Sequence, residues 1–258
     1  MAERFNLYWR ICATGLCFSA FGVGGLCLRL IVFPMLRIGV RQRERRAALA
    51  RGLIHRSFAA FIGMMKALGV LSYEVRGSEK LHRRGLLVLA NHPSLIDVVF
   101  LVSLIRHPDC VVKASLIRNP FTRGPVQTAD FICNDSGAGL LEDCIASVRS
   151  GSNLVIFPEG TRTPPSGALH LQRGAANVAI RGRIDVTPVL IRCHPPTLTK
   201  GEKWYRVPPQ RVHFVIEVQD DIAVQAFVDA APSEALAARR LTDHLTHYFA
   251  KELQRAHA

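Results

Sequence analysis

The sequence predicts an α/β protein in which helices flank a central, mostly parallel sheet, preceded by a membrane-embedded helix and an amphipathic helix. Two short apolar runs, Leu86–Ala90 (LLVLA) and Asn153–Phe157 (NLVIF), are typical of parallel strands buried on both faces. Helical patterns alternate with such runs, as βαβ units require. An uncharged stretch from Ile11 to Leu28 predicts the membrane-embedded helix.

The N-terminal segment is apolar and precedes a group of arginines. After Arg29 the apolar run continues to Leu36, so the segment is long enough to span a bilayer. Its glycines also permit a bent or re-entrant helix, and we therefore predict embedding rather than a full crossing. A cleaved signal peptide is disfavoured, because the run exceeds a usual h-region and no clear cleavage site follows. The arginines predict that the downstream chain stays in the cytoplasm; they are Arg37, Arg41, Arg43, Arg45, Arg46 and Arg51.

A second N-terminal helix is predicted by apolar residues at steps of three and four, namely Ile54, Phe58, Phe61, Met65 and Leu68. The pattern suits a helix packed on a core as well as one lying on a membrane surface. We expect residues 1–70 to form the membrane-anchoring helices and residues 71–258 to form the α/β domain.

The α/β domain follows in order. We predict strands at Leu71–Val75, Leu86–Ala90, Cys110–Lys113, Phe131–Cys133, Asn153–Phe157, Ile184–Arg192 and Val212–Val218, and helices at Val98–Ile105, Leu140–Arg149, Arg173–Ile180 and after Ser233. Pro93 suits the first turn of its helix, and Pro188 indicates an edge strand or a bulge. Residues 193–210 form a proline-rich loop whose Trp204 and Tyr205 suit either a membrane contact or an ordinary connection.

Composition narrows the function. The formal net charge of +13 favours polyanionic partners such as an anionic membrane surface, phosphorylated substrates or nucleic acid. Aromatic residues do not interleave with the arginines, which disfavours nucleic acid. The seven cysteines show no zinc or disulfide spacing, and glycine fingerprints for nucleotides are absent from the sequence. We expect no metal and no bound cofactor.

Two motifs follow the buried strands directly. Residues 91–97 read NHPSLID and residues 157–162 read FPEGTR. Because ligand sites in open α/β sheets collect at the carboxyl ends of strands, His92 and Glu159 are expected to face one crevice. His92 is a candidate general base, and Asp97 can fix its tautomer if His92 lies on the turn before the helix.

The second motif suits substrate binding. Gly160 permits a tight turn and close backbone approach, and Arg162 supplies a forked donor for phosphate. Glu159 accepts hydrogen bonds when ionised, so it can hold a substrate hydroxyl or orient Arg162. Taken alone, each motif also has a structural interpretation: a capping or core histidine, and an ordinary turn.

Together the two motifs resemble the signature blocks of the glycerolipid acyltransferase family, typified by 1-acylglycerol-3-phosphate acyltransferases. The stretch KASLIRNPF from Lys113, the pair Arg173-Gly174 and VTPVLI around Pro188 are similar to further blocks. The resemblance implies a catalytic pair, His92 and Asp97. It also implies substrate contacts from Glu159, Gly160, Thr161, Arg162, Lys113 and Arg173.

The resemblance further implies an inner-membrane O-acyltransferase. Its acyl donor would be an acyl-CoA or an acyl carrier protein, and its acceptor a lysophospholipid, with lysophosphatidic acid favoured. One departure affects the acceptor, because Asn134 and Asp135 stand where the family often has a phosphate-binding arginine, and Ser115 stands where an acidic residue is common. Arg123 or Lys113 can compensate. The alternatives are the same chemistry on a glycolipid or a carrier-protein product, and a basic binding protein without catalysis.

Overall fold

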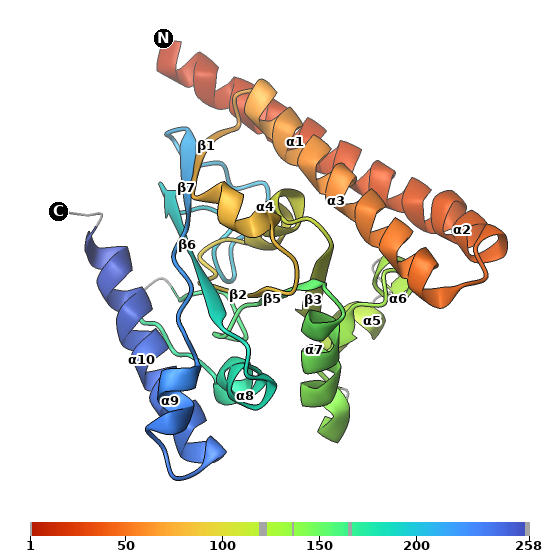
Figure 1. The fold of residues 1–258 in the computed structure, drawn as a ribbon. Helices are drawn as coiled ribbons and strands as arrows, with labels where there is room; N and C mark the ends of the chain where they lie inside the picture. The colour runs from red at the N-terminus through yellow and green to blue at the C-terminus, as the bar shows by residue number, and fades with distance from the viewer. Residues whose placement is uncertain (1, 119–122, 136, 165–166, 256–258) are drawn as a thin grey trace.

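The computed structural model describes residues 2–118, 123–135, 137–164 and 167–255. Within these residues seven strands form one sheet in the order β1-β7-β6-β2-β5-β3-β4, with helices on both faces (Figure 1). The β6–β7 pair is antiparallel and every other pair is parallel, which confirms the predicted mostly parallel sheet. The strands are β1 (Leu71–Arg76), β2 (Leu87–Ala90), β3 (Pro108–Val112), β4 (Ile132–Cys133), β5 (Asn153–Ile156), β6 (Val186–His194) and β7 (Val212–Val218).

Two hydrophobic cores lie on opposite faces of the sheet because side chains alternate along each strand. In β2, Val88 and Ala90 belong to the core beneath α3 (Arg43–Ala67) and α4 (Asp97–Leu104). Leu87 and Leu89 belong to the other core. That core is covered by α7 (Leu140–Arg149), α8 (Arg173–Gly182) and α10 (Glu234–Arg255). Because both faces of β2 are therefore buried, its sequence is a continuous apolar run.

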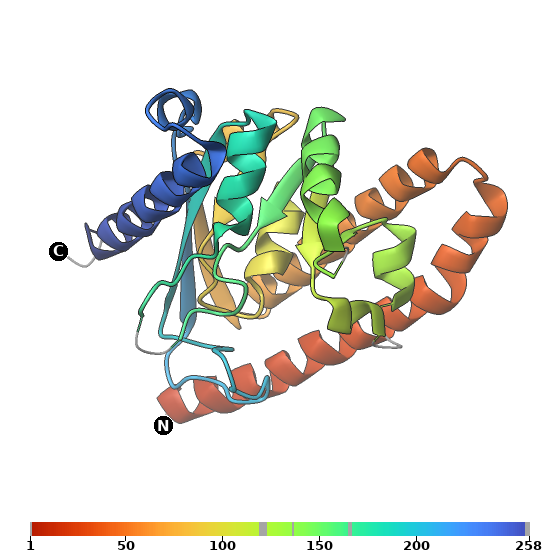
Figure 2. The ribbon, with the colours of Figure 1, turned by 90° about the horizontal axis from the view of Figure 1, so that it is seen from below.

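The N-terminal helices form a long antiparallel hairpin along one side of the domain (Figures 1 and 2). A helical segment runs through α1 (Ala2–Cys27), a π-helical turn (Leu28–Val32) and α2 (Phe33–Gly39) before the chain returns in α3. It is the one helical segment among the described residues that is long and apolar enough to cross a membrane. The predicted apolar face of α3 is confirmed, since Ile54, Phe61 and Met65 are buried.

Several sequence-based boundaries are corrected. The helix α4 begins at Asp97, four residues after Pro93, because residues 91–96 form an extended segment and a turn. Pro188 lies in an interior strand rather than at an edge. The register does contain an extra residue at this point, but it lies in the segment after β7 opposite Pro188, because residues 187–188 face residues 219–221 between the pairs Val189–Val218 and Val186–Ile222.

Other elements are not predicted from the sequence because they are short. These are α5 (Ala114–Arg118), α6 (Arg123–Thr128), α9 (Gln225–Asp229) and 3₁₀ turns at Ser78–His82 and Gly137–Gly139. The end of the motif-like stretch from Lys113, residues 119–121, lies outside the described residues. Ser233 caps α10 as expected, its hydroxyl accepting a bond from the Leu236 N–H at 3.4 Å.

Candidate active site

Three adjacent parallel strands bring the predicted residues together. β2, β5 and β3 are neighbours in the sheet. His92 follows β2, the turn at Gly160 follows β5, and Lys113 follows β3. Because carboxyl ends of parallel strands share one edge, all three positions line a single cavity of about 750 Å³. The two motifs therefore line one cavity through His92 and Gly160, whereas Glu159, which was expected to face the same crevice, is not among the lining residues.

Asn91 ends β2 and starts the turn that carries His92. Its side-chain Nδ2 donates to the Ile191 carbonyl, and its Oδ1 accepts from the Ile191 N–H, both at 2.8 Å. The amide thus occupies the place of a backbone partner for β6 while the main chain leaves the sheet. Sequence reasoning missed this residue, although an asparagine directly after a buried strand was the available signal.

His92 and Asp97 form a hydrogen-bonded pair. Asp97 Oδ2 lies 2.9 Å from His92 Nδ1 and also accepts the Ser94 N–H at 2.6 Å. Because a carboxylate accepts the bond, Nδ1 carries the proton and Nε2 is left as the basic nitrogen. The imidazole lies against the Phe157 ring, with centroids 4.3 Å apart, and lines the cavity.

Asp97 is completely buried beneath His92. Burial raises the pKa of Asp97 to about 6, opposed by the hydrogen bond from His92, by the charge on that ring and by the Ser94 N–H, whereas the nearby Glu159 charge adds to the rise. Below that pH the carboxyl becomes protonated and a weaker acceptor. For the pair to act as a base, Asp97 would have to be ionised.

Glu159 connects the two motifs by hydrogen bonds. Its Oε1 accepts the His92 backbone N–H and the Thr163 hydroxyl, each at 2.9 Å. The Thr163 N–H in turn donates to the His92 carbonyl at 2.8 Å. Burial raises the pKa of Glu159, and these two bonds and the His92 ring charge lower it. Glu159 is buried and does not line the cavity, so its observed contacts suit positioning of His92 rather than a direct substrate contact.

Gly160 forms the expected tight turn. Its φ of 65° lies in the left-handed region, and its N–H donates to the Phe157 carbonyl at 3.0 Å. Gly160 and Thr161 both line the cavity. A side chain at Gly160 would be strained by this φ.

Arg162 lines the cavity, but its guanidinium also has protein partners. Nη1 donates to the carbonyls of Leu198 and Thr199 at 2.8 Å each. Leu198 also accepts the Leu95 N–H at 3.1 Å, so its carbonyl joins both motifs to the loop after β6. Sequence reasoning missed this link, because the partners are backbone atoms of a loop with no motif of its own.

The polar rim combines predicted and unexpected residues. Lys113 is exposed and lines the cavity, as does Lys200, which sequence reasoning did not single out. Asn134 also lines it, and its Oδ1 accepts the Ala114 N–H at 2.9 Å. Asp135 lies 3.4 Å from Arg118. Arg173 begins α8, is exposed, and is not among the residues that line the cavity.

Beyond His92 the cavity is mainly apolar. Its walls come from β3, β5, α7 and α8, with Val111, Ile156, Leu141, Cys144 and Val178 among the lining side chains. A cavity of this size and lining suits a flexible apolar chain. The fold and site thus define an α/β protein with a histidine–aspartate pair at the carboxyl edge of its sheet, beside a cavity for an apolar group.

Comparisons with known proteins point to acyltransferases. A family model described as Acyltransferase matches residues 72–192. The 1-acyl-sn-glycerol-3-phosphate acyltransferases of Saccharomyces cerevisiae and Pseudomonas aeruginosa are 30% and 26% identical over 51% and 50% of the chain. A human beta form is 28% identical over 68% of the chain. The crystal structure of a 1-acyl-sn-glycerophosphate acyltransferase from Thermotoga maritima superimposes with a TM-score of 0.67 over 98% of both chains, at 16% identity.

Residues 72–192 thus match the Acyltransferase family model, and the curated relatives are 1-acyl-sn-glycerol-3-phosphate acyltransferases, which confirms the resemblance seen in the motifs. The matches span 46%, 52% and 60% of the lengths of the three curated relatives. The structural likeness confirms the α/β fold with its N-terminal helices.

Proposed function

We propose that the protein is a membrane-associated O-acyltransferase that moves a fatty acyl group from a thioester to a hydroxyl of a lysophospholipid, with lysophosphatidic acid favoured. The single observation that carries this proposal is the His92–Asp97 pair at the mouth of an apolar cavity. The match of residues 72–192 to the Acyltransferase family model supports the reaction class.

In the proposed reaction, His92 Nε2 takes the proton of the acceptor hydroxyl as its oxygen attacks the thioester carbonyl carbon. A C–O bond forms, and the C–S bond breaks when the tetrahedral intermediate collapses. The imidazolium, stabilised by Asp97, returns the proton to the departing sulfur and yields a free thiol. The Thr161 backbone N–H, in the turn that lines the cavity, is our candidate donor to the oxyanion.

We assign the acyl chain to the apolar cavity and the acceptor phosphate to the cations of its rim. Lys113, Lys200 and Arg162 line the same cavity as His92. They supply the positive charge that the family's usual arginine would provide. The donor carrier, acyl-CoA or acyl carrier protein, delivers its thioester to the same opening in either case.

We propose that α1 lies along the membrane surface with one face inserted, rather than crossing the bilayer. Exposed apolar side chains extend along α1, the π-helical turn and α2, from Phe5 to Ile38. The other side of α1 is fixed to the domain at widely spaced points: Arg10 donates to the carbonyls of Pro208, Pro209 and Gln210, and the Phe18 ring lies 5.2 Å from Trp204. A perpendicular helix would carry this polar domain into the hydrocarbon, which is strongly unfavourable.

This orientation places the active site at the membrane. Figure 2 shows α1 running past the loops that follow β5 and β6, both of which contribute residues to the lining of the cavity. We place the protein at the inner membrane with its site on the cytoplasmic side, in keeping with the arginines that follow the apolar segment.

The proposal is tested with purified protein in lipid nanodiscs by following thiol release from palmitoyl-CoA and from palmitoyl carrier protein in the presence of lysophosphatidic acid. We expect turnover by the native protein, none by His92→Ala, and native turnover by His82→Ala, whose imidazole is exposed outside the site. Native turnover by His92→Ala would exclude the mechanism, and no transfer from either donor to any lysolipid would favour a non-catalytic binding protein.

A second acceptor class is favoured by one observation. Asp135 places a carboxylate next to Asn134 at the cavity rim, and this charge opposes a phosphate dianion. Its neighbour Arg118 partly offsets that charge. A panel of lysolipids with and without a phosphate monoester separates the two acceptors. Rapid turnover of lysophosphatidic acid excludes the alternative, and preference for a glycolipid supports it.

A further inference from the structure

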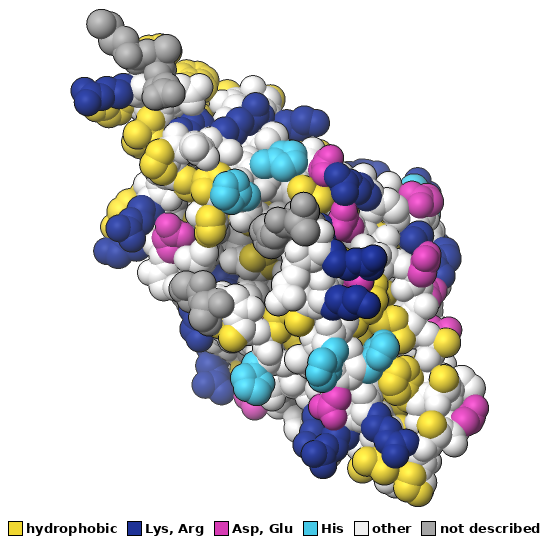
Figure 3. Space-filling view, turned by 90° about the vertical axis from the view of Figure 1, so that its left-hand side faces the viewer, with side chains coloured by type: hydrophobic (Ala, Val, Ile, Leu, Met, Phe, Trp, Pro, Cys, Tyr) yellow, Lys and Arg dark blue, Asp and Glu magenta, His cyan; other side chains and the backbone are white. Residues whose placement is uncertain are grey.

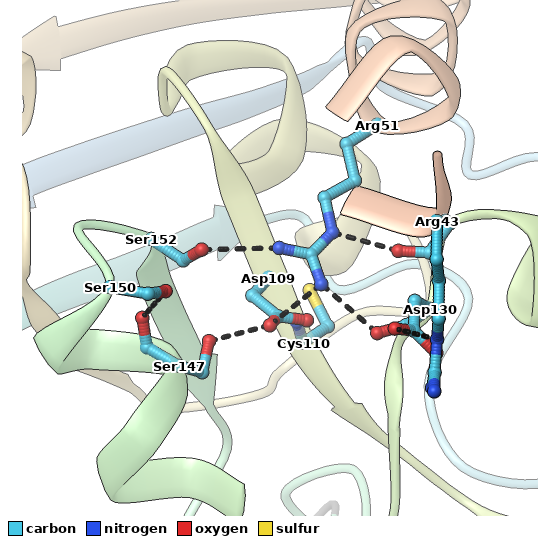
Figure 4. A network of polar contacts seen from close by, with 9 residues as sticks. Arg43, Arg51, Asp109, Cys110, Asp130, Ser147, Ser150 and Ser152 are labelled. Atoms are coloured by element: carbon cyan, nitrogen blue, oxygen red, sulfur yellow. Dashed lines mark hydrogen bonds and ion pairs between the residues drawn. The ribbon is translucent and has the colours of Figure 1, made fainter. Parts of the chain in front are cut away.

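A second groove lies at the opposite edge of the sheet from the active site. It occupies about 1170 Å³ at the amino ends of β2, β3 and β5, between the first half of α3 and the end of α7. Its floor is a polar network centred on Arg51 (Figure 4). The Arg51 guanidinium donates to Asp109, Ser152 and the carbonyls of Ala129 and Asp130.

The acids of this floor are already neutralised. Asp109 is bonded to Arg51 at 2.9 Å and to the Ser147 hydroxyl at 2.6 Å, and Asp130 pairs with Arg43 at 2.7 Å. Two further acids, Glu44 and Asp143, line the groove. Four more arginines line it without a carboxylate partner among the described residues: Arg45, Arg56, Arg84 and Arg106.

These four arginines come from two sides of the groove. Arg45 and Arg56 come from α3, whereas Arg84 and Arg106 come from the loops that precede β2 and β3. Outside the groove, some arginines are paired with acids: Arg76 contacts Glu74 and Glu217, and Arg83 contacts Asp221. Figure 3 shows such mixing, with basic and acidic side chains side by side over one face. The lining of the groove itself has an excess of positive charge, because six arginines line it against four acids.

The surroundings of His107 show this excess of positive charge. Arg84 Nη2 lies 3.0 Å from His107 Nε2, so the arginine donates to a ring nitrogen that carries no proton. Burial lowers the pKa of His107, and the charges of Arg84 and Arg106 lower it further. An anion seated between these groups would relieve the repulsion, and hydroxyls of Ser150 and Ser152 line the same groove.

We propose that this groove binds a soluble ligand carrying phosphate groups. Guanidinium groups on two walls match a ligand with more than one phosphate. A soluble ligand is favoured over a lipid headgroup because the groove lies at the amino edge of the sheet, whereas α1 contacts the loop beyond β6 at the carboxyl edge. The inference does not depend on the proposed acyl transfer.

The test is a titration of full-length protein in nanodiscs of neutral lipid with inorganic pyrophosphate and, separately, orthophosphate, in 0.15 M NaCl. The His107 imidazole is followed by NMR with ¹⁵N-labelled histidine, assigned with His107→Gln. We expect saturable shifts of the His107 signals, a raised His107 pKa, and tighter binding of pyrophosphate than of orthophosphate. A pKa that stays unchanged at saturating pyrophosphate would overturn the proposal.

Variants distinguish a built site from general basicity. Arg84→Ala and Arg106→Ala should each weaken pyrophosphate binding at least tenfold, whereas Arg239→Ala, an exposed arginine on α10, should change it less than twofold. Equal weakening by all three would mean non-specific attraction. His92→Ala should bind pyrophosphate as the native protein does, which separates this result from the fate of the proposed reaction.

Vesicles containing phosphatidic acid test the lipid source of phosphate. If the Arg84→Ala, Arg106→Ala double variant keeps native vesicle binding, a soluble ligand is supported. If it loses vesicle binding while pyrophosphate fails to bind the native protein, the groove contacts lipid headgroups and the proposal is wrong.

Discussion

Asp97 Oδ2 lies 2.9 Å from His92 Nδ1, although five sequence positions separate the two residues. On a regular helix residues five apart do not face each other. The contact forms because His92 stands in the extended segment after β2 and Asp97 is the first residue of α4. The Ser94 N–H holds the same oxygen at 2.6 Å and fixes the turn between them.

Substitution of His92 should remove transfer while leaving the fold intact. We expect His92→Gln to lower kcat by about 10²–10⁴-fold, the usual contribution of a general base. The His92 side chain is partly exposed at the cavity, so the unfolding temperature should change little. Thiol-release kinetics and thermal unfolding of the same preparation check both expectations. Loss of activity only in step with loss of folded protein would contradict them.

Asp97→Asn should separate activity from stability. Because the folded-state pKa of Asp97 is raised from 3.8 to about 6, the folded protein binds the proton more tightly than the unfolded chain. Stability therefore falls as pH rises from about 4 to about 6 and stays lower above that window. Asparagine cannot ionise, so at pH 7 the variant should be as stable as the native protein or more stable by roughly 1–3 kcal/mol.

The same substitution should lower kcat/KM strongly, because the amide no longer stabilises the imidazolium. In the native protein kcat/KM should fall as pH drops below about 6, where Asp97 becomes protonated. Urea unfolding at pH 5 and pH 7 and a pH–rate profile supply the measurements. A large destabilisation of Asp97→Asn at pH 7 would contradict the expected direction of the stability change.

Asn91→Ala should damage both the sheet and the site. It removes two buried hydrogen bonds to Ile191 and leaves that N–H and carbonyl without their partners. Each such group costs about 1–3 kcal/mol. We expect lower thermal stability and a reduced kcat with little change in KM, since His92 is displaced rather than the acceptor contacts. An unchanged unfolding temperature would show that the Asn91 amide does not replace a backbone hydrogen-bond partner of β6.

The Arg51–Asp109 pair should behave as a buried ion pair. Arg51→Met leaves the buried Asp109 without its main partner and should lower the free energy of unfolding by about 3–5 kcal/mol. Adding Asp109→Leu should restore much of that loss, because no unpaired charge remains. Arg45→Met is the matched control on the same helix. Chemical denaturation of the native protein and these variants gives the coupling energy between Arg51 and Asp109. If the stability losses of the two single substitutions simply add in the double variant, the two residues are not coupled.

Replacement of apolar residues on α1 and the π-helical turn that follows it should weaken membrane binding. Leu16 and Leu30 are 58% and 59% exposed on the helical segment that we place in the membrane. The double variant Leu16→Glu, Leu30→Glu should lose at least tenfold in vesicle affinity, since burial of each leucine contributes roughly 1.5–3 kcal/mol. Leu49→Glu, an exposed leucine of α3, should bind vesicles normally. Equal losses in both proteins would show that α3 also inserts.

Elements with local signals could be predicted from the amino-acid sequence alone. Buried strands such as β5 are apolar runs in the sequence, and the buried face of α3 is marked by apolar residues at steps of three and four. Both motifs lie at strand ends. Because side-chain periodicity follows directly from backbone geometry, these features need no tertiary information. The family resemblance likewise depended on contiguous residues.

Contacts between distant segments became visible only in the folded chain. Arg51, expected among cytoplasmic membrane arginines, is instead held at the amino edge of the sheet by Asp109. Arg162 donates to backbone carbonyls of a loop 36 and 37 residues away, and Glu159 supports the His92 backbone across 67 residues. Backbone carbonyls and N–H groups occur at nearly every position, so no sequence pattern marks which of them a buried charged side chain will reach.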